Sequence, residues 1–131
     1  MNITGNPLID VGLVFNSEMP SLQQLMMVCG DYYHNKTSKI LGNEATINFM
    51  NLRSINCDFE FEKISISSTK MEKICFNGNR LNDINIASLK NLKFVRISQN
   101  NLTNLEFIFH KATNYENNII TDLDLNYNQI T

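Results

Sequence analysis

The fold of this chain is decided by three stretches: MEKICFNGNRL at residues 71–81, LKFVRISQNNL at 92–102 and ITDLDLNYNQI at 120–130. Each fits the pattern L-x-x-L-x-L-x-x-N-x-L, in which L stands for any large apolar residue. The asparagines of the copies, Asn79, Asn100 and Asn128, follow one another after 21 and then 28 residues. The chain has 46 Leu, Ile, Val, Met and Phe residues and 21 Asn, frequencies that give roughly 0.3 copies by chance. Three copies in order therefore indicate a true repeat.

The spacing within one copy predicts a short strand followed by a turn. The two apolar residues of L-x-L point to one face of a strand, and the x residue points to the other face. Stacked copies then form a parallel sheet whose inner face carries the pairs Ile74/Phe76, Val95/Ile97 and Leu123/Leu125. The Asn stands where the chain leaves the strand, and its amide can satisfy backbone groups that would otherwise be buried without a partner.

A weaker copy lies upstream and starts the repeat region near residue 47. It consists of Phe49, Leu52, Ser54, Cys57 and Phe59, with Cys57 at the Asn position. A cysteine can fill that position as a small buried residue, but it satisfies fewer backbone groups than an amide. The period and the apolar positions resemble leucine-rich repeats. This resemblance implies a solenoid over residues 47–131, whose copies cannot bury their apolar faces alone and whose ends need caps.

Residues 1–46 lack the repeat, and their pattern predicts two helices that cap the first open edge of the solenoid. Asn6 and Pro7 can start the first helix, because Asn is a favoured cap and Pro fits the first helical position. A second helix is expected from Pro20 and Ser21 onward, because apolar residues recur there at helical spacing. These residues are Leu22, Leu25, Met26, Cys29 and Tyr32 or Tyr33. The expected fold class is α/β, with two N-terminal helices followed by a short leucine-rich-repeat-like solenoid with a parallel sheet.

The start of the chain carries a second resemblance. Thr4, Gly5, Asn6 and Pro7, followed by Asp10 and Gly12, resemble the T-G-N-P-x-x-D-x-G start of the large subunit of type I-B CRISPR interference complexes (Cascade). That family is several times longer and has paired C-x-x-C motifs, which are absent here. The resemblance implies a truncated, phage-encoded relative that docks in place of the subunit and blocks assembly, which would make it an anti-CRISPR. The alternative is a well-capped first helix.

Length and composition restrict the other functions. A chain of 131 residues is about one domain, and a net charge of −2 with 18% charged residues argues against a dedicated nucleic-acid-binding surface. The sequence has no P-loop, dinucleotide fingerprint, nucleophile elbow or H-E-x-x-H motif. We therefore expect no enzymatic activity and no cofactor.

Membrane and redox signals are also weak. No apolar run reaches membrane-spanning length, and residues 1–20 lack the pattern of a signal peptide. The three cysteines, Cys29, Cys57 and Cys75, have no C-x-x-C spacing. This favours reduced thiols in a cytoplasmic protein, located in the bacterial host cell if the chain is phage-encoded. A zinc site from these cysteines and His34 would lack the usual paired spacing.

The x positions of the repeat are the candidates for partner contact. Cys75, Phe94, Arg96 and Asp124 stand at such positions and are expected to share one face. Phe94 is a large apolar residue pointing away from the core, which indicates a contact with a protein partner or with the N-terminal segment. The chain stops directly after the last copy, so we also expect that the last apolar turn either frays or is covered by another protein.

Three functions stay open. The first is mimicry of the Cascade large subunit through Thr4–Gly12, and the second is a repeat adaptor that binds an unrelated protein. The third is a small RNA-binding factor, in which crRNA or another RNA contacts a basic cluster. That cluster consists of Arg80, Lys90, Lys93 and Arg96.

Overall fold

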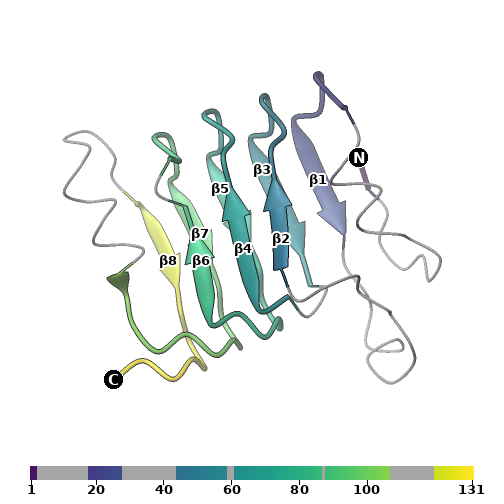
Figure 1. The fold of residues 1–131 in the computed structure, drawn as a ribbon. Coiled ribbons are helices and arrows are strands. Elements are labelled where there is room, and N and C mark those ends of the chain that lie inside the picture. Colours follow the sequence, from purple (N-terminus) through teal and green to yellow (C-terminus); the bar gives the residue numbers. More distant parts are fainter. Residues whose placement is uncertain (3–17, 28–43, 59–60, 87, 107–119) are drawn as a thin grey trace.

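The computed structural model describes residues 1–2, 18–27, 44–58, 61–86, 88–106 and 120–131. All elements in these residues are short strands, and all pair in parallel. They are β1 (Gln24–Met27), β2 (Glu44–Ile47), β3 (Ser54–Cys57), β4 (Lys63–Ile66), β5 (Lys73–Cys75), β6 (Asp83–Asn85), β7 (Phe94–Arg96) and β8 (Asp122–Asp124). Sheet A has the order β1-β3-β5-β7-β8, and sheet B has the order β2-β4-β6. From β1 to β7 the chain alternates between the two sheets, which gives a flattened solenoid (Figure 1).

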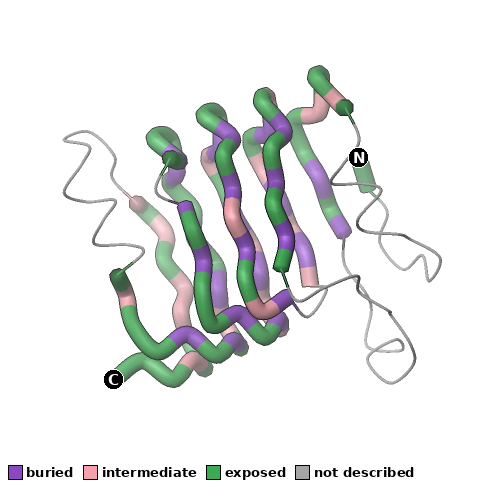
Figure 2. Tube along the Cα trace, in the orientation of Figure 1, coloured by how far each residue is buried: buried purple, intermediate pink, exposed green. Residues whose placement is uncertain are grey.

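The core lies between the two sheets. In each coil, apolar residues two positions apart point into it once from sheet A and once from sheet B. In the coil from β5 to β7, Ile74 and Phe76 point inwards from sheet A, and Ile84 and Ile86 point inwards from sheet B. All of these side chains are buried, while the residues between them face outwards, as the alternating colours of Figure 2 show. Every second residue can thus be buried because both sheets present their inner faces to the same core.

The prediction of two N-terminal helices is wrong for the second helix, which falls partly within the described residues. The segment expected to be the second helix contains β1, whose residues Leu25 and Met27 are buried and pair with Ile55 and Cys57. Met26, which a helix would have placed on its apolar face, points outwards and is 41% exposed. Backbone pairing with β3 and burial of alternate residues outweigh the helical spacing. The first expected helix, which begins at residues 6–7, lies outside the described residues.

The α/β fold class is therefore also wrong, because the described elements form two parallel sheets rather than helices followed by one sheet. Sheet B was not expected. β1 extends sheet A and joins the same core, so the solenoid includes residues upstream of 47.

The upstream copy of the repeat was placed three residues out of register. Ile55 pairs with Ile74, and Ser54 pairs with Lys73, so Cys57 corresponds to Phe76. Cys57 is therefore an inward-pointing core residue with no exposed surface, and it does not occupy the Asn position. The shift arose because Phe49 and Leu52 are apolar at the right spacing, although Phe49 belongs to the turn after β2.

The three expected asparagines do form a ladder at the turn after each sheet A strand. Asn100 is 5% exposed; its Oδ1 accepts the N–H of Leu81 at 3.0 Å, and its Nδ2 donates to the carbonyl of Phe76 at 2.7 Å. Asn79 accepts the N–H of Phe61 and donates to the carbonyl of Cys57. Asn128 likewise accepts the N–H of Leu102 and donates to the carbonyl of Ile97. Each amide thus joins two coils through backbone groups, and this prediction of the repeat is confirmed.

Each asparagine of the ladder follows a residue with positive φ. These residues are Gly78 (69°), Gln99 (56°) and Tyr127 (57°). The left-handed conformation turns the chain sharply, so that the next side chain points back towards the preceding coil. Only one of the three positions has glycine, the residue that adopts this conformation without steric cost.

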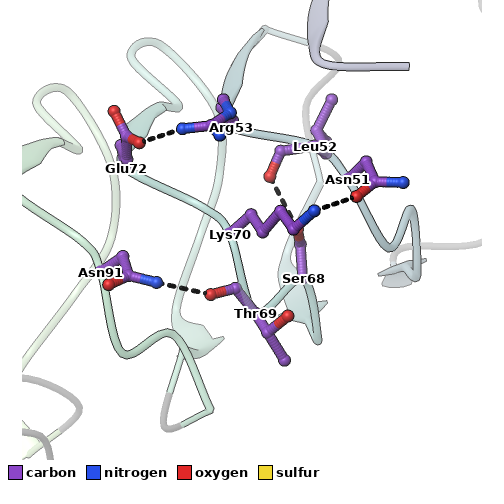
Figure 3. A network of polar contacts seen from close by, with 8 residues as sticks. All are labelled: Asn51, Leu52, Arg53, Ser68, Thr69, Lys70, Glu72 and Asn91. Atoms are coloured by element: carbon purple, nitrogen blue, oxygen red, sulfur yellow. Dashed lines mark hydrogen bonds and ion pairs between the residues drawn. The ribbon is translucent and has the colours of Figure 1, made fainter. Parts of the chain in front are cut away.

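A second set of bonds joins the coils at the opposite end of the sheet A strands (Figure 3). Asn51 donates to the carbonyl of Pro20 at 2.7 Å, and Asn91 donates to the carbonyl of Thr69 at 2.8 Å. Lys70 holds the equivalent position in the coil between them and donates to Oδ1 of Asn51 at 2.6 Å. Polar side chains therefore satisfy turn carbonyls at both ends of the solenoid cross-section.

Candidate functional site

The candidate site is the outer face of sheet A, which consists of the side chains that point away from the core. Pairing of the strands places them in two rows. The first row is Gln24, Ser54, Lys73, Phe94 and Asp122; the second row is Met26, Asn56, Cys75, Arg96 and Asp124. Cys75, Arg96 and Asp124 are thus direct neighbours, which confirms the expectation that these x positions share one face.

Phe94 is the large aromatic side chain on this face. It lies between Lys73 and Asp122 in the first row and is 40% exposed. Its neighbour Val95, one residue along the strand, points inwards and has no exposed surface. The core therefore does not need Phe94, and its ring is available for contact on the outer face.

Arg96 is held by an ion pair across the two rows. Its guanidinium donates to Oδ2 of Asp122 at 2.9 Å. This hydrogen bond, together with the charge of the carboxylate, raises the pKa of Arg96, so the side chain stays charged at any working pH. A second exposed ion pair, between Arg53 and Glu72 at 2.6 Å, lies just before β3 and β5 (Figure 3). Both pairs join neighbouring coils and fix the positions of two cations beside the outer face.

A hollow of about 440 Å³ lies over β3 and β5. Its floor consists of the small side chains Ser54, Asn56 and Cys75. Longer side chains flank this floor. They are Gln24 and Met26 on β1, beside which Met1 and Asn2 also line the hollow, and Lys73 and Arg96 on β5 and β7. The hollow therefore follows from the residue sizes in the two rows, because the sheet itself has no break there.

The thiol of Cys75 is a weak nucleophile in this setting. Partial burial raises its pKa, and this effect exceeds the opposite effects of a backbone hydrogen bond from Asn77 and of the nearby charges of Lys73 and Arg96. The thiolate is the reactive form of cysteine, so a raised pKa lowers reactivity at neutral pH. Neither Cys57 nor Cys75 forms a disulfide within the described residues, and Cys29 lies outside them. No cluster of three or more His, Cys, Asp or Glu side chains that could hold a metal occurs among the described residues.

The structure brings together only some of the candidate contact residues. Phe94 and Arg96 stand on β7 and share the outer face of sheet A. Thr4, Gly5, Asn6, Pro7, Asp10 and Gly12, which carry the resemblance to Cascade, lie outside the described residues.

The basic cluster is divided by the fold. Lys93 and Arg96 lie at β7, whereas Lys90 precedes that strand in the turn from sheet B. Arg80 follows the opposite, carboxyl end of β5, which runs parallel to β7. Arg80 and Lys90 therefore stand at opposite ends of the strands, and the four cations do not form one patch.

The sequence pattern did not identify several other residues of the outer face as candidates. Met26, Ser54, Asn56 and Lys73 line the hollow but were not candidates. The signal for the first of them was present, because Leu22, Leu25 and Met27 have the L-x-x-L-x-L spacing and leave Met26 at an x position.

Comparison of the chain with protein-family models, with curated proteins and with solved structures finds no match. Within the described residues, no helix has the length and the apolar content needed to span a membrane. The assignment of a function therefore rests on the geometry of the outer face and on the sequence.

Proposed function

We propose that this chain is a non-catalytic protein-binding module that contacts its partner through the outer face of sheet A. The observation that carries the proposal is the exposure of Phe94. A partner that covered the ring completely would remove roughly 80 Å² of its surface from water. Such burial is worth about 2 kcal/mol, which is the contribution expected of a residue that dominates an interface.

The surroundings of Phe94 fit a binding role better than a catalytic one. Arg96 and Asp122 are paired with each other, and so are Arg53 and Glu72. Such pairs give an interface a fixed pattern of charge, which contributes mainly to specificity. The thiol of Cys75, whose pKa is raised by burial, is held in its unreactive form.

A subunit of a type I CRISPR Cascade is the partner that we propose first, and the bacterial cytoplasm is the corresponding location. This part of the proposal is supported by the sequence of residues 4–12 alone. It is tested by binding of the chain to purified Cascade subunits. The parent is expected to bind and to block assembly, and a variant with both Asn6→Ala and Asp10→Ala is expected to remain folded without binding. Equal inhibition by this variant would leave an adaptor with an unrelated partner as the better account.

The binding face is tested without knowledge of the partner. Random octapeptides displayed on phage are selected on the immobilised protein, and enriched peptides are measured against two variants. Phe94→Ser should weaken binding roughly thirtyfold, which corresponds to the loss of about 2 kcal/mol. Met50→Ser is the matched control, because Met50 is 73% exposed but lies in the turn after β2, away from the outer face of sheet A. Equal affinity of the enriched peptides for Phe94→Ser and the parent would refute the proposed face.

A further inference from the structure

The outer face of sheet A is cationic over its middle strands, although the whole chain has a net charge of −2. Arg53, Lys73, Lys93 and Arg96 lie on or directly before β3, β5 and β7. Glu72 neutralises Arg53, and Asp122 of β8 neutralises Arg96. Positive charge therefore remains at Lys73, in the first row on β5, and at Lys93, directly before β7.

These two lysines are not used by the fold. Within the part of the chain that the structure describes, neither ammonium group has a hydrogen bond or an ion pair, and both residues are exposed. On sheet B, by contrast, Lys63 has Glu44 at 3.5 Å. An unpaired lysine is ordinary on a surface, but Lys73 also forms one wall of the hollow over β3 and β5.

The dimensions of the hollow suit an extended polypeptide segment. Its walls stand on β1 and on β5 and β7, with β3 between them. Neighbouring strands are about 4.8 Å apart, so β1 and β5 are about 10 Å apart, which is close to the thickness of one extended chain with its side chains. Ser54 and Asn56 on the floor offer hydrogen-bonding groups, and Met26 offers an apolar contact that is 41% exposed.

We propose that the hollow binds an acidic, extended segment of a protein partner, with a carboxylate of that segment paired to Lys73. This inference rests on the proposed function and specifies the chemistry of the ligand. Apolar side chains of the same segment contact Met26 on one side and Phe94 on the other. The charge of the face complements that of the segment, while Asp124 on β8 repels acidic groups and so limits the binding region to β1–β7.

A protein segment fits this surface better than RNA does. Nucleic-acid-binding grooves have a row of cations that follows successive phosphates, together with aromatic rings on which bases stack. Here, two unpaired lysines lie beside a thioether, a thiol and the acidic strand β8. Arg80 and Lys90, which would extend such a row, stand at opposite ends of the strands.

The test selects displayed random octapeptides on three forms of the protein: the parent, Lys73→Glu and Lys63→Glu. Lys63→Glu changes the net charge by the same amount on sheet B, and circular dichroism verifies that all three forms are folded. The parent and Lys63→Glu should enrich peptides rich in Asp and Glu, whereas Lys73→Glu should lose this preference. The best acidic peptide should bind Lys73→Glu roughly tenfold more weakly than the parent.

Several outcomes would overturn the inference. Enriched peptides without acidic residues that still depend on Phe94 would refute it while leaving the proposed function standing. An equal loss of acidic peptides in Lys63→Glu would show that only the net charge matters. A single-stranded RNA oligomer that binds the parent at 150 mM salt more tightly than the best acidic peptide, and that loses binding in Lys73→Glu, would assign the hollow to RNA.

Discussion

The amide of Asn100 makes the strongest prediction about stability, because it serves three backbone groups from a buried position. Its Oδ1 accepts the N–H of Leu81 at 3.0 Å, and its Nδ2 donates to the carbonyls of Phe76 at 2.7 Å and of Ser98 at 3.0 Å. The carbonyl of Ser98 keeps a second donor in Asn100→Ala, since the N–H of Gly78 also reaches it at 3.1 Å. The variant therefore deprives two buried backbone groups of the bonds made by Asn100. Each such loss costs roughly 1–3 kcal/mol, and water entering the space left by the amide recovers part of it, so we expect a total of about 2–4 kcal/mol.

Two other asparagines serve as internal standards for this measurement. Asn128 makes the equivalent bonds to Leu102 and Ile97 of the preceding coil but is only half-buried, so Asn128→Ala should cost about 1 kcal/mol, because water can replace the amide. Asn101 is exposed, and within the described residues its side chain makes one long bond, accepted from Gln129 at 3.4 Å. Asn101→Ala should therefore change stability by less than about 0.5 kcal/mol.

Urea unfolding followed by far-UV circular dichroism measures the three variants, because the chain has no tryptophan. The expected order of destabilisation is Asn100, then Asn128, then Asn101. Equal midpoints for Asn100→Ala and Asn101→Ala would refute the ladder as a source of stability. A fall in the slope of the transition would instead show that the coils unfold separately.

Three further variants and one reactivity assay test other parts of the structure. Ile74→Ala should cost about 2–5 kcal/mol in urea unfolding, because its side chain is fully buried. Leu123→Ala, at the equivalent position of β8 but 48% exposed, should cost about 1 kcal/mol; equal costs would contradict the burial pattern. Gln99→Gly should raise stability by about 0.5–1 kcal/mol, because it relieves a positive φ, and a loss of stability would contradict that conformation. Iodoacetamide should alkylate Cys75 at pH 8 more slowly than in the urea-unfolded chain, because the raised pKa lowers the thiolate fraction, and an equal or faster rate by mass spectrometry would contradict it.

The sequence predicts sheet A from β5 to β8 because its constraints there are local. Apolar residues at every second position point inwards and determine how the strands pair. The asparagine that follows at a fixed interval determines the turn. Ile74, Val95 and Leu123 accordingly stand in one register. The amide of each asparagine bonds to the preceding coil, so the prediction of these strands does not depend on distant parts of the chain.

The same reasoning fails at β1 because two adjacent methionines fit two periods. Leu22 and Leu25 are three residues apart in both a helix and a repeat. A helix then requires an apolar residue at 26, and the repeat requires one at 27, and both positions are Met. The choice is made by pairing with β3, whose position in space the local pattern does not contain.

Sheet B was missed for a different reason. Leu81, Ile84 and Ile86 repeat the L-x-x-L-x-L spacing directly after Asn79, and all three are buried. The repeat pattern ends with an asparagine and a further apolar residue, and no buried amide follows β6 in the described residues. The apolar spacing alone therefore indicates a strand, whereas the buried asparagine indicates that this strand belongs to sheet A.

The repeat predicts which positions of β5, β7 and β8 face outwards, but it does not predict the hollow, and this limit has a physical cause. Burial fixes the apolar character of the inward positions, so every coil must repeat them, whereas the outward positions bear no such constraint and differ from strand to strand. The hollow exists because Ser54 and Asn56 are small while Met26 and Lys73 on the flanking strands are long, a comparison that has meaning only once β1, β3 and β5 are known to be neighbours. Because selection for folding does not act on these positions, the ones that depart from small polar residues, Phe94 above all, are where we expect the function of this chain to be encoded.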